Sequence, residues 1–410
     1  MGYLFLITIL AIVVRMPLLF SVVCSKNNFP WFICHLTALS ILTIYVYVNG
    51  IVTPGGDELG YIHIANSSEI NSLTDLTNFY SIEQPGFPAI LFVLGSILKA
   101  GAIGVKLLNM LVFYLITCET VTFGAKICEK LSDNYLNILI LLSPLAYYSI
   151  FLLKDLYIVF STMALINLML ANQFKSKGTL FIFIHLLNLI NFRTYAVIYP
   201  ACVLLFIYLY DLLISRKSYI TITGNSIIQI ITGVISFFLV IVILGFQFEN
   251  SRVIFSQDFH NLLYNYLISF EGSLISSIYA YIFVDTSYAS LLTYNQFDFF
   301  LLRSSLIAVY SCSVSPCLIP AYLFLTYQLT RNNWYNTQLK ITSNRNLSIC
   351  LLLPLLGLIQ SVLIQETVRY RLFDIPYSAI LFILYAHTNR KLSLLCSLAY
   401  CVTIIIRIVW

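Results

Sequence analysis

Long apolar runs constrain this chain more than any motif does. Of its 410 residues, 60% are hydrophobic and only 10% are charged. A soluble domain carries about 25% charged residues. A helix needs about 20 apolar residues to cross a bilayer, and runs of that kind recur along the whole chain. The sequence therefore predicts an all-α polytopic membrane protein.

About twelve transmembrane helices are expected. The candidate spans are residues 2–23, 32–50, 102–125, 135–153, 155–174, 178–192, 194–213, 226–247, 299–328, 346–365, 373–388 and 392–409. The first carries Arg15 near its middle and has no small-residue cleavage site, so it is interpreted as a membrane helix and not as a signal peptide. No internal repeat or low-complexity linker divides the chain. A single integral membrane domain over residues 1–410 is predicted.

The basic residues predict an orientation, because cytoplasmic loops are enriched in Lys and Arg. With the loop around Asp57 outside, every predicted inside connection contains a basic residue. These residues are Lys26, Lys126, Lys130, Lys175, Lys177, Arg216, Lys217, Arg331, Lys340, Arg345, Arg390 and Lys391. Both termini then lie outside. The net charge of +5 is spread over short loops without a basic run, so nucleic acid is not an expected partner.

An acidic extracytoplasmic loop is predicted at residues 51–101. It begins with the adjacent carboxylates Asp57 and Glu58, which lie among glycines, and no Lys or Arg occurs between Ile51 and Phe87. Such a pair does chemistry or binds a cation. The following apolar piece, residues 88–98, is too short to cross a bilayer and is expected to lie flat at the outer face as an interfacial or re-entrant helix. A second outer loop is predicted at residues 248–298.

Basic side chains are expected at the same outer face: Lys154 beside Asp155, Arg193, and the pair Arg369 and Arg371. Each has a structural alternative, such as a Lys–Asp pair that closes a turn or an Arg that snorkels to the headgroups. Together they suggest more. A carboxylate can accept a proton, and basic groups can bind phosphate and stabilise its developing charge. The combination favours transfer from a phosphate-linked, and in lipid a lipid-linked, donor to a hydroxyl group.

Short segments resemble one family. Asp57-Glu58 followed by Tyr61 and Ala65 resembles the first extracytoplasmic loop of GT-C glycosyltransferases, polytopic enzymes that use polyprenyl-phosphate-linked sugars. Residues 84–91 resemble the Pro-rich start of their juxtamembrane helix. Other segments are similar to bacterial GT-C-like proteins of surface-polysaccharide clusters: residues 143–155, 192–195 and 368–371, the last followed by Pro376. The chain departs from the family in having two predicted helices before the acidic loop and no large soluble C-terminal domain.

The resemblance implies roles for individual residues. Asp57 corresponds to the catalytic base, and Glu58 to its partner or to a ligand of a divalent metal such as Mg or Mn. The donor phosphate would be bound by Lys154, Arg193, Arg369 and Arg371. Supporting residues would be Tyr61, His63, Asp155 and Gln84.

The implied function is sugar or glycan transfer from a polyprenyl-linked donor, on the periplasmic face of the bacterial inner membrane, in O-antigen, lipopolysaccharide or other surface-polysaccharide biosynthesis. Other membrane proteins of polysaccharide assembly are the expected partners.

Three alternatives stay open. O-antigen polymerases are similar in size and composition, and rely on periplasmic arginines. A transporter or flippase is less favoured, because no inverted repeat is visible and the charges gather at one face. An acyltransferase is less favoured because only His63 and His260 fall in outer loops, without a His-Asp motif. The ten cysteines show no CxxC or zinc spacing and are expected to be small buried residues.

Overall fold

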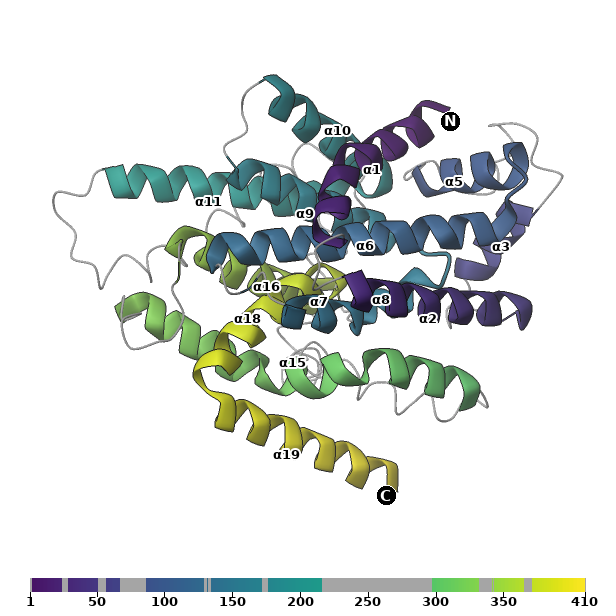
Figure 1. Ribbon diagram of the computed structural model, residues 1–410. Coiled ribbons are helices and arrows are strands. Elements are labelled where there is room, and N and C mark those ends of the chain that lie inside the picture. The colour runs from purple at the N-terminus through teal and green to yellow at the C-terminus, as the bar shows by residue number, and fades with distance from the viewer. Residues whose placement is uncertain are drawn as a thin grey trace, which may run out of the picture. The chain divides into compact units, whose positions relative to one another are not determined.

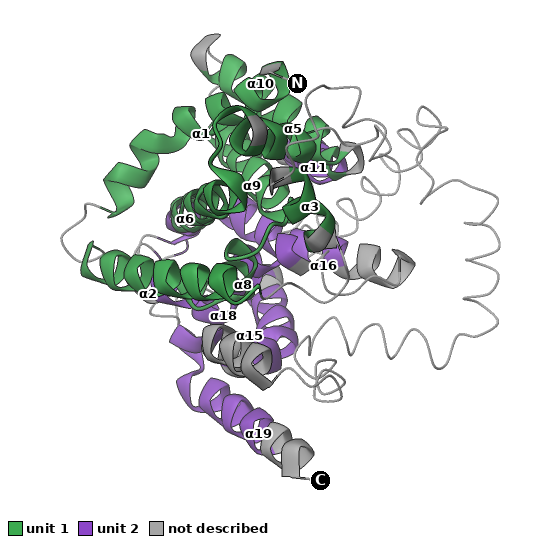
Figure 2. Ribbon diagram, turned by 90° about the vertical axis from the view of Figure 1, so that its right-hand side faces the viewer, with its two compact units in different colours: residues 1–123, 140–197 green, residues 124–139, 198–410 purple. Residues whose placement is uncertain are grey.

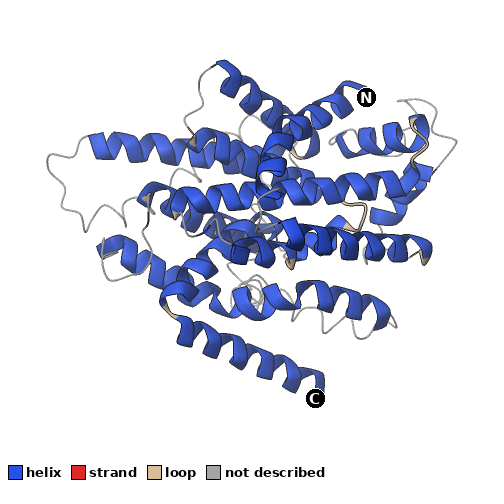
Figure 3. Cartoon of the chain, viewed as in Figure 1, coloured by secondary structure: helices blue, strands red, loops and turns tan. Residues whose placement is uncertain are grey.

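The computed structural model describes residues 2–23, 29–50, 57–66, 86–128, 131, 134–171, 176–215, 297–331, 341, 343–364 and 371–409. Within these ranges the chain is almost entirely helical (Figure 3), and the β-structure is a single bridge between Cys128 and Ile341. The prediction of an all-helical protein is confirmed for this part of the chain. The predicted span 226–247 and the second outer loop lie outside the described residues.

Three of the described helices are long and apolar enough to cross a membrane: α1 (Gly2–Val23), α2 (Phe29–Val48) and α6 (Gly101–Ile127) (Figure 1). At 1.5 Å per residue they measure about 33, 30 and 40 Å, comparable to the apolar thickness of a bilayer. These helices give the chain its membrane-protein character. The total of about twelve spans stays a prediction.

Most other helices coincide with predicted spans. They are α9 (Asp155–Leu170), α10 (Ser176–Phe192), α11 (Ile198–Ser215), α15 (Phe297–Arg331), α16 (Asn344–Ile364), α18 (Ile375–Thr388) and α19 (Arg390–Val409). Two short 3₁₀ helices, η3 (Thr194–Val197) and η5 (Arg371–Phe373), precede α11 and α18.

The predicted continuous span 135–153 is wrong. The chain forms α7 (Asn134–Leu141) and the short helix α8 (Pro144–Ser149), and residues 150–154 are not helical. The Ser143 side chain accepts a hydrogen bond from the Leu145 N–H at 3.3 Å and so caps a new helix. Pro144, which has no N–H, suits the first position of that helix and cannot continue the preceding one.

The piece expected to lie at the outer face as an interfacial or re-entrant helix is a short helix, and its position relative to a bilayer stays a prediction. It forms α5 (Gly86–Leu91), which continues as the π-helix η1 (Phe92–Ile97). All six residues of α5 are buried, against α1, α3 (Asp57–Asn66) and α10, while Ile97 is exposed. The apolar composition was recognised, but its side chains are covered by protein helices.

The chain divides into two compact units (Figure 2). Unit 1 comprises residues 1–123 and 140–197, and unit 2 comprises residues 124–139 and 198–410. In unit 2, α15 packs against α18 and α19, and α16 packs against α11, α18 and η5. The rings of Tyr199 and Phe373 stack with centroids 5.1 Å apart.

Side-chain contacts fix the relative directions of the helices in unit 1. Helices α9 and α10 are antiparallel, because Asp155 contacts Arg193 while the later residue Ser161 contacts the earlier residue Asn188. Helices α2 and α6 are antiparallel for the same reason: His35 contacts Tyr114, and Thr43 contacts Met110. Contacts in the same order show that α6 and α9 are parallel: Asn109 to Phe151 and Glu119 to Asn167.

Helix α1 runs in the same direction as α6 and α9. Its Thr8 contacts Asn188, which also contacts Ser161, and Arg15 contacts Glu119, which also contacts Asn167. The start of α6, the start of α9 and the end of α10 therefore share one end of unit 1. This alternation agrees with the predicted order of the corresponding spans.

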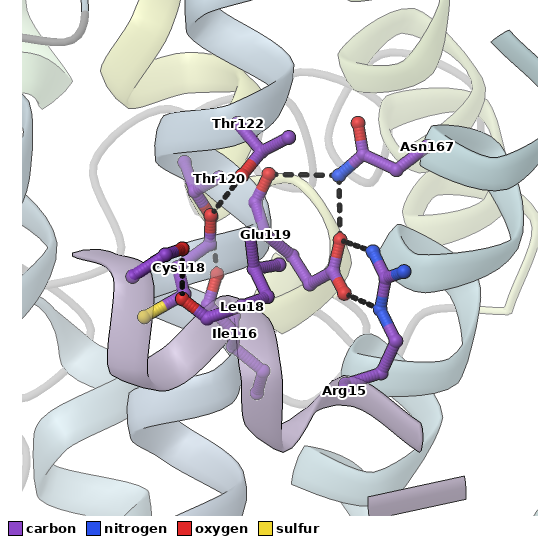
Figure 4. Close-up of polar contacts among 9 residues, drawn as sticks. Arg15, Leu18, Ile116, Cys118, Glu119, Thr120, Thr122 and Asn167 are labelled. Carbon is purple, nitrogen blue, oxygen red and sulfur yellow. Dashed lines mark hydrogen bonds and ion pairs between the residues drawn. The ribbon is translucent and has the colours of Figure 1, made fainter. Parts of the chain in front are cut away.

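An ion pair between a buried carboxylate and a half-buried guanidinium holds α1 to α6 (Figure 4). The Arg15 guanidinium donates through Nε and Nη2 to the two carboxylate oxygens of Glu119, the second at 2.6 Å. The Asn167 amide donates to Glu119 Oε2 at 2.7 Å and to its backbone carbonyl at 2.8 Å. Because much of α1 is exposed and apolar, and lipid is as apolar as these side chains, polar contacts are its specific attachment.

We expect Arg15→Leu or Glu119→Leu alone to lower the free energy of unfolding by about 3–5 kcal/mol, because each leaves one charge buried without its partner. The double variant should recover much of this loss. Denaturation midpoints of the purified protein in detergent would measure it, with Leu10→Ala, an exposed position on α1, as control. The prediction is contradicted if the double variant is no more stable than the less stable of the two single variants.

Candidate functional site

The candidate site lies at the end of unit 1 where α6 and α9 begin and α10 ends. The acidic helix α3 joins this end through Glu58. Its residues Glu58, Tyr61 and Ile64 are buried, at the spacing of one helix face. Asp57 and Glu58 stand in its first turn, where the helix dipole favours negative charge.

Glu58 is bonded to α6 and to the segment before α9. Its Oε1 accepts hydrogen bonds from Lys106 Nζ at 2.9 Å and from the Leu152 N–H at 3.0 Å. Glu58 is 0% exposed and Lys106 is 1% exposed. Lys106 also donates to the Ile150 carbonyl at 2.9 Å and lies 5.3 Å from the centroid of the Phe151 ring. One ammonium therefore joins three segments.

The non-helical segment 150–154 has its backbone satisfied partly by side chains and partly by other backbone groups, such as the Leu153 N–H that donates to the Phe151 carbonyl. Besides the bonds at Ile150 and Leu152, the Asn109 amide donates to the Phe151 carbonyl at 2.6 Å. Irregular backbone at membrane depth is tolerated where protein provides such partners. The segment ends at Lys154, the N-cap residue of α9, whose side chain makes no capping bond. The first N–H groups of α9 thus face this end of the unit.

Asp155 and Arg193 face each other across the start of α9 and the end of α10. Their closest atoms, Oδ1 and Nη2, are 3.9 Å apart, within ion-pair range but too far for a hydrogen bond. Both side chains are buried. The Arg193 backbone N–H donates to the Leu189 carbonyl at 2.8 Å and so prolongs the α10 ladder. The backbone of the two helix ends thereby holds the Asp155 and Arg193 side chains in place.

Aromatic rings connect the four elements below these charges. Tyr61 of α3 meets Phe87 of α5 edge-on at 4.8 Å, and Phe87 lies 6.0 Å from Tyr157 of α9. Tyr157 stacks on Phe192 of α10 at 4.8 Å. Such contacts add to the area that the rings bury. This cluster of aromatic rings holds α3 near the ends of α9 and α10.

The structure brings several predicted residues together. Glu58, Asp155 and Arg193 share this end of unit 1, and half-buried Lys154 immediately precedes Asp155 in the sequence. Tyr61 belongs to the aromatic cluster, and His63 is exposed on α3. Asp57 begins α3, but its side chain is not among the described ones.

Gln84 and Arg369 lie outside the described residues, and Arg371 begins η5 in unit 2, with a side chain that is likewise not described. The nearby Asp374 carboxylate occupies the space where a Cβ at Gly357 would lie, since its oxygens would be 2.0 and 2.2 Å away. The segment η5 and the following Asp374 are thus packed onto α16. Its role in phosphate binding stays a prediction.

Lys106 and Asn109 are the residues that the sequence reasoning missed. Lys106 is a charge inside an apolar run, and such charges are functional candidates by default. The signal was therefore present. What the sequence did not provide was the partner, because Glu58 is 48 positions away.

A metal site does not fit the described residues. They contain no group of three or more His, Cys, Asp or Glu side chains able to hold a metal ion. Glu58 Oε1, half of the predicted metal-binding pair, already accepts bonds from Lys106 and Leu152. No step of the proposed chemistry is therefore assigned to Mg or Mn.

Comparison with known proteins found no match to any family model, curated protein or solved structure.

Gly86 is required by the close approach of α5 to α10. A Cβ at this position would lie 2.9 Å from the carbonyl oxygen of Asn191. Because a backbone atom is the obstacle, we expect Gly86→Ala to lower the free energy of unfolding by about 1–3 kcal/mol. Ile97→Ala, an exposed position in the same segment, should change it by less than about 0.5 kcal/mol. Equal denaturation midpoints for the two variants contradict this account.

Proposed function

We propose that the chain is a membrane glycosyltransferase. It transfers a sugar or glycan from a polyprenyl-phosphate-linked donor to a hydroxyl acceptor on the periplasmic face of the bacterial inner membrane, in O-antigen or other surface-polysaccharide biosynthesis. The observation that carries the proposal is the bond from the Leu152 N–H to Glu58 of α3, because Leu152 lies two residues before Lys154, and Arg193 faces Asp155 at the same end of unit 1. This places a carboxylate helix beside candidate phosphate-binding groups.

The donor phosphate would bind at the start of α9. The N–H groups of a helix N-terminus favour an anion. Lys154 immediately precedes this helix, and Arg193 lies opposite Asp155. An arginine binds phosphate oxygens through two charge-assisted hydrogen bonds, and the charge of Asp155 keeps the guanidinium near the helix start. These groups stabilise the charge that develops on the phosphate as it leaves.

Asp57 is the proposed general base. It accepts the proton of the acceptor hydroxyl while the new bond from the sugar C1 to the acceptor oxygen forms and the C1–O bond to the donor phosphate breaks. The products are the glycosylated acceptor and polyprenyl phosphate. Glu58, the next residue, accepts from the Leu152 N–H, and Lys154 follows two residues later, within about 7 Å along the chain. The proton acceptor and the phosphate groups thus belong to one neighbourhood.

Asp57→Asn is the direct test. Asn serves the start of a helix as well as Asp does, but it is not a base. We expect transfer to fall by about 10²–10⁴-fold, the usual contribution of a general base, with a normal amount of protein in the membrane. The readout is the abundance and chain length of surface polysaccharide in a strain that carries only the variant gene.

Ile97→Ala, exposed and away from the charged residues, is the control and should leave the polysaccharide unchanged. Normal polysaccharide with Asp57→Asn would show that Asp57 is not the base. Loss of long chains with retention of single repeat units would point to the polymerase alternative.

A further inference from the structure

We propose that Lys106 is a positioning residue of this site, and that Glu58 is its partner and not the base. The inference rests on the proposed function, because it assigns the way in which the base and the phosphate-binding groups are held together. The observation behind it is the set of three bonds at one point: Lys106 to Glu58, Lys106 to the Ile150 carbonyl, and Glu58 to the Leu152 N–H.

The direction of the Lys106 side chain shows that the contact is built into the protein. Lys106 is the sixth residue of α6, about 8 Å from the start of the helix. A lysine this close to a helix end can snorkel to water at the membrane surface. Lys106 is instead buried and turned toward Glu58 and the 150–154 segment. Its charge therefore serves an internal contact.

The same bonds separate the roles of the two adjacent carboxylates. Glu58 Oε1 already accepts from two donors, one of them a buried ammonium. Proton transfer to that oxygen would require one of these bonds to be given up. Asp57, one position earlier, begins the helix that Glu58 holds. Glu58 thus orients α3, and the base function falls to Asp57.

Lys106 also determines the distance between the proposed base and the proposed phosphate-binding groups. Through Glu58 it holds α3 with Asp57, and through Ile150 it holds the segment that leads to Lys154 and Asp155. Without the ammonium, Glu58 would be a buried charge lacking its counter-ion, and α3 would be drawn toward water. A displacement of about 1 Å between reacting groups can cost about 100-fold in rate.

The experiment combines activity with a structural readout. A cysteine replacing the buried Tyr61 reports whether α3 stays docked, and a membrane-impermeant maleimide detects it, with labelled peptides identified by mass spectrometry. Labelling uses Tyr61→Cys proteins, and activity is measured on proteins that retain Tyr61. The variants are Lys106→Met, Lys106→Arg and Glu58→Gln. The control is His35→Phe, which removes a buried contact to Tyr114 of α6 without touching the site.

Lys106→Met should expose position 61 to the maleimide and lower polysaccharide synthesis about 100-fold. Lys106→Arg, which keeps the charge, should restore protection of position 61 and part of the activity. Glu58→Gln keeps an acceptor oxygen for Lys106 and Leu152, so it should retain activity within about tenfold of the native protein, far above Asp57→Asn. His35→Phe should leave position 61 protected. If Lys106→Met does not accumulate, Lys106→Arg and Glu58→Gln still provide the test.

Two results overturn the inference: activity lost in Lys106→Met while position 61 stays protected, or Glu58→Gln as inactive as Asp57→Asn. The first would place Lys106 on the substrate, and the second would make Glu58 a base. Exposure of position 61 in Lys106→Met together with normal synthesis in Asp57→Asn would instead reject the proposed function, and would leave Lys106 as the residue that docks α3.

Discussion

Polar backbone groups that are buried away from water need hydrogen-bond partners, and the break between α8 and α9 is the place where this chain meets that constraint. Each of three side chains supplies a partner there: Lys106 for Ile150, Asn109 for Phe151, and Glu58 for Leu152. Lys106 and Asn109 are one helical turn apart on α6, so a single face of that helix holds the break. The break in turn creates the N-terminus of α9 and its neighbouring charges.

Helix α6 carries the opposite charges on which the attachments of α1 and α3 depend. Lys106 pairs with Glu58 of α3, and Glu119 pairs with Arg15 of α1. The two charges on α6 are 13 positions apart, about 20 Å along the axis. The two ion pairs therefore lie at different positions along α6. Of the three long apolar helices, α6 is the most buried, as expected for the helix against which the others are placed.

The sequence predicted the long helices well, because their length and apolarity are local properties. It also predicted that Lys154, Asp155 and Arg193 lie at one face, since helix alternation places the ends of neighbouring spans together. The contact between Asp155 and Arg193 is consistent with this reasoning. The relative directions of α1, α2, α6, α9 and α10 follow the same alternation.

Other features were not predicted, for physical reasons that differ. The break between α7 and α8 was signalled by Ser143-Pro144, but hydropathy outweighed that local capping signal. The burial of α5 depends on distant helices that cover it, and hydropathy alone does not tell lipid from protein. Arg15 stands out in the sequence as a charge within a predicted span, but nothing in the sequence pairs it with Glu119, 104 positions away. A charged residue in an apolar run indicates that a partner is needed, and only the packing shows which one it is.

The position of the break suits chemistry on a lipid-linked phosphate. The hydrocarbon tail of such a donor lies in the bilayer, so its phosphate lies at the depth where membrane helices end. In unit 1 the start of α9 is at the same end as the start of α6 and the end of α10. The first N–H groups of α9 have no partner within their own helix, so they point toward this end of the unit. Through the bond between Glu58 and Leu152, the irregular segment holds the start of α9 near α3, which is the arrangement that the proposed phosphate binding requires.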